Sequence, residues 1–195
     1  MKSVYCLGIA SSPRLHGNTT VLLESALEGA KKAGARTELL SLSKYNFSSC
    51  RACEGCSRDG NCVIHDDMQE IYFKLLAADR LILAAPIFSM GICAQAKALV
   101  DRTQRFWATK FVLQREVVPN LHSRPERKGI FVSTAGSDVQ NAFEGALQVA
   151  RYFFYVLEMQ YTGCYCYNRI NEQGAILNYP DKLKEVYQAG FRLGS

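Results

Sequence analysis

The residues best suited to chemistry in this chain are four cysteines within one short polar stretch. They are Cys50, Cys53, Cys56 and Cys62, spaced C-x2-C-x2-C-x5-C, and they are half of the eight cysteines in the chain. Four thiolates on a flexible loop can surround one inorganic centre, and the C-x2-C-x2-C part is typical of loops that hold iron–sulfur clusters. Gly60 and Asn61 ease the turn before the fourth cysteine. The spacing therefore favours a [4Fe–4S] cluster in this cysteine loop, residues 50–62.

Three alternatives compete with a cluster in the cysteine loop. Zinc also accepts four thiolates, but it usually binds them as two separated pairs. Disulfides are disfavoured because we expect a reducing cytoplasm, where many cysteines indicate metal or redox work. The last alternative is a loop that holds no metal.

A second polar loop lies between a predicted strand at residues 2–10 and a predicted helix at 18–33. A helix start offers unpaired N–H groups and the positive end of the helix dipole, which together can bind a phosphate. Gly17 lets the backbone approach closely, and Arg14 can add a charge-assisted hydrogen bond. The short polar side chains here are Ser11, Asn18, Thr19 and Thr20. Because neither a Walker loop nor a Gly-x-Gly-x-x-Gly pattern is present, the loop alone fits a phosphate site and an unliganded helix start equally well.

Apolar patterns predict strands that alternate with helices. The predicted strands are 2–10, 36–42, 79–85, 128–134 and 160–167, and the predicted helices are 18–33, 66–77, 91–107, 139–157 and a short one opened by Pro180. This alternation indicates an α/β fold with a parallel sheet covered on both faces. Five strands fit a flavodoxin-like, doubly wound sheet of order 2-1-3-4-5, which binds ligands beyond the carboxyl ends of its strands. The loops after strands one, three and four should therefore carry the site.

Several motifs together resemble the NADPH-dependent FMN reductase-like flavoproteins. They are Gly8–Arg14 with Gly17–Thr19, Val63–Met68 after the cysteine loop, Ala85–Phe88 at the end of the third strand, and Lys97–Arg102 on the next helix. The resemblance spans nearly the whole chain, and the compact cysteine loop is most similar to the iron–sulfur flavoprotein branch. It implies one flavodoxin-like FMN-binding domain over residues 1–195.

The resemblance also implies which residues hold FMN. The phosphate would lie against Ser11, Arg14, Asn18, Thr19 and Thr20. The isoalloxazine ring would lie against Pro86, Ile87, Phe88, Ser89, Met90 and Gly91, and its polar edge would meet backbone groups of Thr134, Ala135 and Gly136. Phe88 stands where the family commonly has Tyr, and Ala135 where it often has a second glycine, so these two contacts would differ.

The activity implied by the resemblance is that of an FMN-dependent oxidoreductase. Our leading hypothesis passes electrons between a donor such as ferredoxin, a [4Fe–4S] cluster, FMN and a small-molecule acceptor. No catalytic acid or base is needed, because the cofactors carry the chemistry. One alternative is an NAD(P)H-dependent FMN or quinone reductase without a cluster. The other is a flavodoxin-like electron carrier, which is disfavoured because such carriers tend to be acidic and this chain has a net charge of +5.

Charge and hydropathy exclude some other classes. No apolar run is long enough for a membrane span, and no recognition motif accompanies the mild positive charge, so we expect no nucleic-acid partner. We expect no signal peptide, because Val4–Ile9 runs straight into the second polar loop. The basic residues of one region are Arg105, Lys110, Arg115, Arg124, Arg127 and Lys128, and we interpret them as a solvated surface, or else as a dock for an acidic protein or a phosphorylated cofactor.

Other residues are predicted to be structural. Asp66 and Asp67 should cap a helix, and Lys97 should pair with Asp101 four residues later, with Arg102 less constrained. The cysteines outside the loop, which are Cys6, Cys93, Cys164 and Cys166, should be buried. The extended segment 110–127 is long for an ordinary loop. We predict that it packs across a partner subunit in a homodimer or homotetramer and helps to cover the flavin.

Overall fold

The core of the protein is a five-stranded parallel sheet, seen in a computed structural model that describes residues 3–195. The strands are β1 (Tyr5–Ala10), β2 (Arg36–Ser41), β3 (Arg80–Ala84), β6 (Lys128–Thr134) and β7 (Gln160–Tyr167). Their order is β2-β1-β3-β6-β7, and every neighbouring pair is parallel. The predicted flavodoxin-like order 2-1-3-4-5 is therefore confirmed, because β6 and β7 are the fourth and fifth strands of this sheet.

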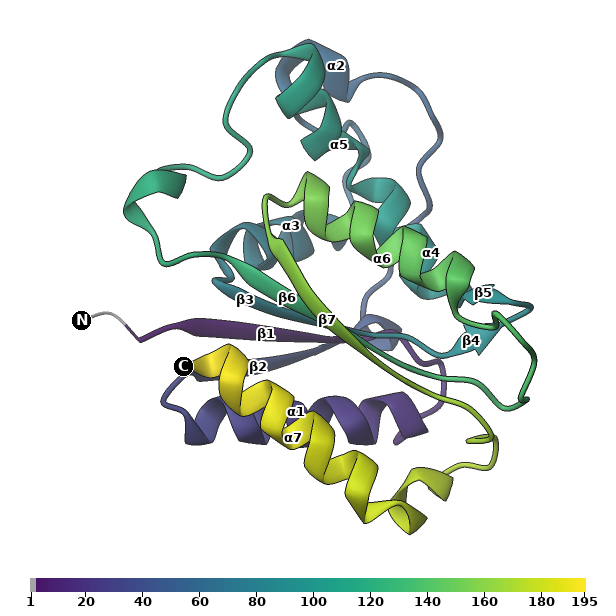
Figure 1. Cartoon of the computed structure of the whole chain (residues 1–195). Coiled ribbons are helices and arrows are strands. Elements are labelled where there is room, and N and C mark those ends of the chain that lie inside the picture. Colours follow the sequence, from purple (N-terminus) through teal and green to yellow (C-terminus); the bar gives the residue numbers. More distant parts are fainter. Residues whose placement is uncertain (1–2) are drawn as a thin grey trace.

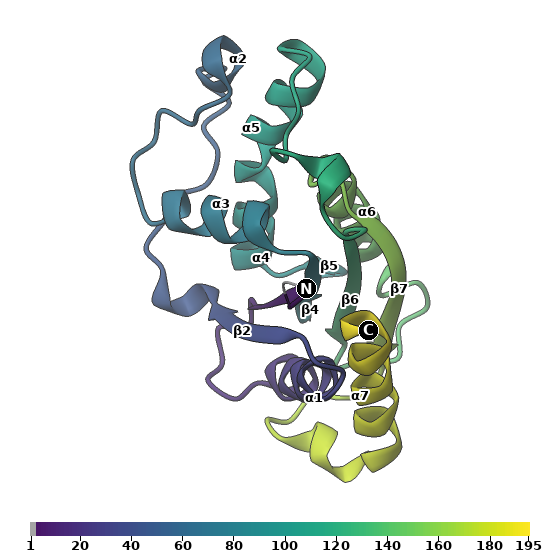
Figure 2. The ribbon, with the colours of Figure 1, turned by 90° about the vertical axis from the view of Figure 1, so that its left-hand side faces the viewer.

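Helices cover both faces of the sheet (Figures 1 and 2). One face carries α1 (Asn18–Lys32) and α7 (Pro180–Gly194), and the other carries α3 (Met68–Ala77), α4 (Ala94–Arg102) and α6 (Glu144–Val156). The helix that Pro180 opens has 15 residues and is not short. It packs tightly on α1, since a Cβ added at Gly190 would lie 1.9 Å from the carbonyl oxygen of Ala26. Two apolar cores result, with β1 and β3 buried between them.

The chain between β3 and α4 forms a hairpin that the sequence did not predict. Its strands are β4 (Ile87–Phe88) and β5 (Gly91–Ile92), and its turn residues Ser89 and Met90 have φ values of 49° and 65°. The predicted helix at 91–107 begins only at Ala94. It is also interrupted at Thr103, after which α5 (Gln104–Trp107) and a π-helical turn (Ala108–Val112) continue the chain.

Two arginines, Arg124 and Arg127, form hydrogen bonds at the amino ends of the strands. Arg124 pairs with Asp79 at 2.8 Å, and the Asp79 carboxylate also accepts the backbone N–H of Tyr5. Arg127 is 3% exposed and donates to three carbonyls, those of Leu75, Ala78 and Leu157. The interpretation of one solvated basic surface is wrong for these two residues, because their guanidinium groups satisfy carbonyls at helix ends.

The extended segment 110–127 is partly buried by its own chain. Within this segment, Val117 and Val118 are buried in the core, whereas Phe111 and Val112 are 42% and 47% exposed. Packing across a partner is therefore not needed to remove Val117 and Val118 from water. In the part of the chain that is described, no helix is long and apolar enough to cross a membrane.

The cysteine loop projects away from the sheet together with the end of α5 (Figures 1 and 2). It contains one short helix, α2 (Cys56–Asp59), which ends at Gly60 with a φ of 85°. Among the other cysteines, Cys6 and Cys93 are buried as predicted. On the edge strand β7, Cys164 is exposed and Cys166 is half-buried, so the predicted burial is wrong for Cys164 and only partly correct for Cys166.

Candidate functional site

The loop after β1 is fastened to the sheet before it reaches α1. Ser11 is 1% exposed, and its Oγ donates to the carbonyl of Ala84 at 2.7 Å. The thiol of Cys93 in turn donates to the Ser11 carbonyl at 3.3 Å. Ser11 therefore fixes the start of the loop and is not a free donor for a ligand.

The amino end of α1 supplies the donors that an anion needs. In residues 3–195, the backbone N–H groups of Asn18 and Thr19 donate to no protein acceptor, whereas those of Thr20 and Val21 bond to the Gly17 carbonyl. No acidic residue stands in the first turn of α1. Unpaired N–H groups and an unopposed helix dipole favour a negatively charged group at this position.

A small cleft of about 60 Å³ opens at this helix end, across the carboxyl ends of β1, β3 and β6. The predicted FMN residues that line it are Arg14, Asn18, Thr19, Pro86, Ile87, Phe88, Thr134 and Gly136. The predicted residues Ser11, Thr20, Ser89, Met90, Gly91 and Ala135 are not among its lining residues. The structure thus brings together loops from three predicted places in the sequence, as the sheet order requires.

A fourth loop, after β7, completes the cleft and was missed by the sequence reasoning. Ile170 and Asn171 line it, and the Asn171 carbonyl accepts Arg14 Nη1 at 3.0 Å. The Asn18 amide donates to the carbonyl of Glu172 at 2.8 Å. The side chains of Arg14 and Asn18 therefore hold this loop in place. The signal that could have found it is its position directly after the fifth predicted strand.

The glycine at position 136 is required by the approach of the same loop. A Cβ added at Gly136 would lie 2.7 Å from Oδ1 of Asn171. At position 17, an added Cβ would lie 2.5 Å from Oγ of Ser12. These two glycines keep the cleft open where backbone N–H groups can reach a ligand.

The four cysteines of the loop line a separate, larger cavity of about 720 Å³. The cavity is also lined by residues of α4, α5 and α6, among which are Arg102, Arg105, Trp107 and Tyr152. Burial raises the pKa of Cys56, and the neighbouring Cys62, Cys50 and Cys53 raise it further. Ala52 and Glu54 have φ values of 51° and 57°, so the backbone curls between the cysteines.

Comparison with known proteins decides the family. The sequence model described as NADPH-dependent FMN reductase matches residues 4–169. This chain belongs to the NADPH-dependent FMN reductase family. The family is one of flavin-dependent oxidoreductases, and its match spans the cysteine loop and every residue that lines the cleft except Ile170 and Asn171.

Relatives within the family carry the name iron–sulfur flavoprotein. One from Methanocaldococcus jannaschii is 41% identical over 98 residues, which are 50% of this chain and 51% of the relative. One from Methanosarcina thermophila is 39% identical over 122 residues, which are 63% of this chain and 64% of the relative. The matched segments thus span between about half and two thirds of these relatives.

Solved structures of the same fold include two oxidoreductases. The NAD(P)H:quinone oxidoreductase from Methanothermobacter marburgensis has a TM-score of 0.71 at 19% identity, and the match covers 98% of this chain and 100% of that one. A flavone reductase has a TM-score of 0.69 at 19% identity, covering 98% and 62% of the two chains. At this level of identity the likeness shows the flavodoxin-like fold.

The cleft of this FMN reductase family member fits the phosphate end of FMN. Two unpaired N–H groups converge there, Gly17 and Gly136 keep the backbone accessible, and Arg14 adds positive charge. The cleft lies at the amino end of α1 and is also lined by Pro86, Ile87 and Thr134, on the side where the ring of FMN would lie. The exposed side chain of Phe88 lies at its rim.

The cysteine loop fits a cluster in the chemistry of its donors and less well in their convergence. Its four thiols are free and share one cavity. Within residues 3–195, however, no three His, Cys, Asp or Glu side chains are close enough together to hold a metal ion. Four thiolates are the usual ligands of a [4Fe–4S] cluster. The loop has these four ligands, but their sulfur atoms would have to move closer together to bind one.

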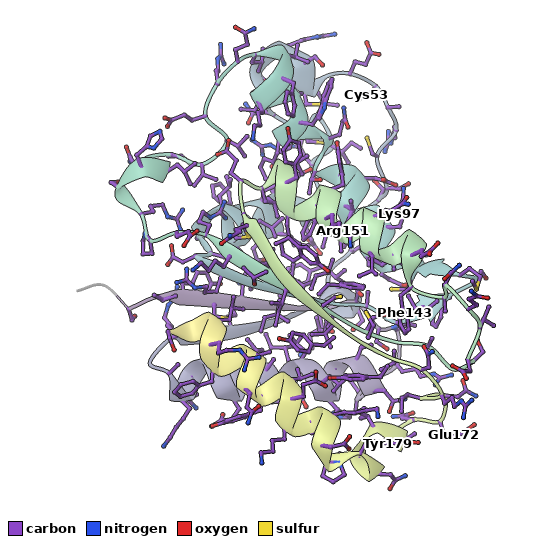
Figure 3. All side chains as sticks on the ribbon, viewed as in Figure 1. Cys53, Lys97, Phe143, Arg151, Glu172 and Tyr179 are labelled. Carbon is purple, nitrogen blue, oxygen red and sulfur yellow. The ribbon has the colours of Figure 1, made fainter. Side chains whose placement is uncertain are left out.

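The helix α4 connects the two sites of this flavoprotein. It follows Cys93, which contacts the loop at α1, and it ends at Arg102, which lines the cysteine cavity. Its nine residues span about 14 Å. In Figure 3 the labelled Cys53 and Glu172 lie at opposite ends of the molecule, with Lys97 of α4 between them. The predicted pair of Lys97 and Asp101 is confirmed at 2.6 Å.

The two predicted helix caps have different outcomes. The Asp66 carboxylate accepts the N–H of Met68 at 3.1 Å, so Asp66 caps α3 as predicted. The Asp67 carboxylate instead accepts the N–H of Asn46 at 2.6 Å, and it makes no side-chain cap bond to α3. Burial alone would raise the pKa of Asp66, but the Arg102 guanidinium and the Ser48 N–H outweigh burial and lower that pKa.

Proposed function

We propose that this protein is an FMN-dependent oxidoreductase whose cysteine loop holds a [4Fe–4S] cluster, with Cys50, Cys53, Cys56 and Cys62 as the ligands. The observation that carries the proposal is that all four cysteines line one cavity, in a chain of the NADPH-dependent FMN reductase family that also has a cleft at the amino end of α1. The name of the curated relatives supports the same proposal.

The protein's own part in the reaction is to bind and orient. The N–H groups of Asn18 and Thr19 would hold the FMN phosphate, and the rim at Pro86–Phe88 and Thr134–Gly136 would support the ring. Bound FMN exchanges one or two electrons and a cluster exchanges one, so a protein with both can join one-electron donors to two-electron acceptors. No side-chain acid or base is required in this proposal.

The partners of the reaction belong to the proposal too. We propose ferredoxin or NAD(P)H as the electron donor, a small molecule as the acceptor, and the cytoplasm as the compartment. We also propose a homodimer or homotetramer. Phe111 and Tyr155 stack at 6.1 Å and, with Val112, leave large apolar side chains exposed next to the cysteine cavity. Light scattering that shows only monomers at working concentration would contradict the assembly.

One experiment tests the central proposal. The protein is purified without exposure to air, and FMN, iron and acid-labile sulfide are measured per chain together with the absorption spectrum. We expect one FMN and about four iron atoms per chain, with a broad absorption shoulder beside the flavin bands. Flavin without iron in such protein would reject the cluster.

A second candidate is an NAD(P)H-dependent FMN or quinone reductase without a cluster. The separation of the thiols in residues 3–195 favours it, since no three metal-binding side chains converge there. Rapid reduction of bound FMN by NADPH, in protein that contains no iron after anaerobic purification, would establish this alternative. Reduced ferredoxin as the sole effective donor would exclude it.

A further inference from the structure

Arg102, the last residue of α4, is unusual for a charged residue in a small domain. Its side chain is fully buried, with 0% of its surface exposed, although the guanidinium group carries a charge. The sequence reasoning expected Arg102 to be weakly constrained, and the structure shows the opposite. A buried guanidinium persists only where polar groups compensate for its lost hydration.

The polar partners of Arg102 come from both sides of the cysteine loop. Before the loop, the carbonyl of Ser48 accepts Nη1 at 2.8 Å. After the loop, the two carboxylate oxygens of Asp66 accept Nη1 at 2.7 Å and Nη2 at 3.0 Å, and the carbonyl of Ile64 accepts Nη2 at 3.3 Å. One planar group therefore joins the two ends of the segment 48–66. The bidentate pairing with Asp66 adds both strength and geometric specificity.

The carboxylate partner is itself held in place. Asp66 accepts the N–H of Ser48 at 3.0 Å as well as that of Met68 at the start of α3. The hydroxyl of Tyr72, on α3, donates to the backbone carbonyl of Arg102 at 2.9 Å. The start of α3 therefore holds the Asp66 carboxylate in place, and the end of α4 holds the Arg102 guanidinium group.

The chain between these ends makes few hydrogen bonds to the rest of the protein, although Gly60 packs against Thr109 and Cys62 packs against the core. In residues 3–195, the only hydrogen bond from residues 49–63 to the rest of the chain joins Asn61 Oδ1 to Arg105 Nη2, at 3.0 Å. The remaining hydrogen bonds of residues 49–63 are internal to that stretch. Apart from this packing, the position of the four cysteines depends on how the two ends of the loop are held.

We infer that Arg102 is a positioning residue that closes the neck of the cysteine loop and so confines its four thiols to one cavity. Holding the ends together removes part of the entropy that the loop would lose when its thiols converge on a common ligand. Lysine cannot replace it fully, because one ammonium group cannot contact both carboxylate oxygens and two carbonyls in a plane. The closing of the neck does not depend on the proposed function, and only its consequence for a cluster rests on that proposal.

The test compares Arg102→Met and Arg102→Lys with the wild type, and with Lys97→Met as a matched control. Lys97→Met removes a positive charge from the exposed face of the same helix, where, among residues 3–195, Lys97 forms its ion pair with Asp101 alone. The first readout is backbone hydrogen exchange of residues 49–63 in the absence of iron. We expect exchange there to accelerate about tenfold or more in Arg102→Met, less in Arg102→Lys, and not in Lys97→Met. Exchange in β1 and β3 should stay unchanged in all three variants.

The second readout is iron per chain after anaerobic desalting, together with the reduction potential of any cluster. Loss of iron from Arg102→Met, with partial retention in Arg102→Lys, is expected. Unchanged exchange of residues 49–63 in a folded Arg102→Met variant would overturn the inference. Should that variant fail to fold, Asp66→Asn tests the same neck, and unchanged exchange in it has the same meaning. Wild-type protein without iron would overturn the cluster proposal, whereas the exchange result would still decide the role of Arg102.

Discussion

The cleft at the amino end of α1 and the cysteine loop are built in different ways. The cleft is formed by loops that leave four parallel strands at one edge of the sheet, and its donors are backbone N–H groups of α1. The cysteine loop projects from the fold, and in residues 3–195 it has one hydrogen bond of its own to the rest of the chain. The sheet therefore stabilises the cleft, whereas we infer that the cysteine loop depends in large part on the buried side chain of Arg102. Changes at one site should leave the other intact.

The largest expected effect comes from removing a thiol. Cys56→Ser should lower the iron content sharply if the proposed cluster is present, because a hydroxyl is a poorer iron ligand than the thiolate it replaces, while FMN content stays at the wild-type level. Iron and flavin assays on anaerobic protein measure both. Cys164→Ser is the matched control, since Cys164 is an exposed thiol outside the loop. Equal iron loss in both variants would show that the effect is not specific to the loop.

A substitution at the cleft should weaken FMN binding and leave the cysteine loop unchanged. Gly17→Val places a side chain against Oγ of Ser12, where even a Cβ would lie at 2.5 Å. We expect FMN affinity to fall about tenfold or more, which is a loss of about 1.4 kcal/mol, with no change in iron content. Flavin fluorescence titration measures the affinity. Gly34→Val is a suitable control, because an added Cβ there meets nothing within 4 Å, although its φ of 102° makes some loss of stability expected. Parallel loss of iron in Gly17→Val would mean that the two sites are not independent.

Acid should weaken the cysteine loop before it weakens the cleft. The pKa of Asp66 is lowered in the folded protein, so its carboxylate stabilises the neck fully above its unfolded pKa of about 4. This stabilisation is lost as the pH falls through the lowered folded pKa. Hydrogen exchange of residues 49–63 should therefore accelerate below about pH 4 relative to that of β1. Asp66→Asn should remove the pH dependence, and its persistence in that variant would assign it to another group.

The smallest expected effect concerns strain beside the cleft. Met90 has a φ of 65° in the turn between β4 and β5, a conformation that costs most residues about 1–2 kcal/mol. Met90→Gly should raise the melting temperature by a few degrees, and Met90→Ala should not. Calorimetry of both variants decides this. No gain from glycine would show that other contacts of the hairpin already compensate for the strain.

Much of the fold was predictable because it depends on local patterns. The predicted strands at 128–134 and 160–167 have the bounds of β6 and β7, since each is a short run of strand-forming residues between turn signals. The hairpin after β3 was not predictable, because Ser89 and Met90 lack the glycine or asparagine that usually marks such a turn. The burial of Arg127 was missed for a different reason. The carbonyls to which it donates belong to residues at least 30 positions away in the sequence.

By itself, the sequence determined where the strands of the sheet lie along the chain, the helix start that can hold a phosphate, and the spacing of the four cysteines. Each of these follows from residues that are close together in the chain. Only the tertiary structure decided that the loop after β7 completes the cleft and that Arg102 joins the two ends of the cysteine loop. Those contacts link residues between 36 and 157 positions apart. No local pattern specifies them, because the distance between such residues is set by how helices and strands pack.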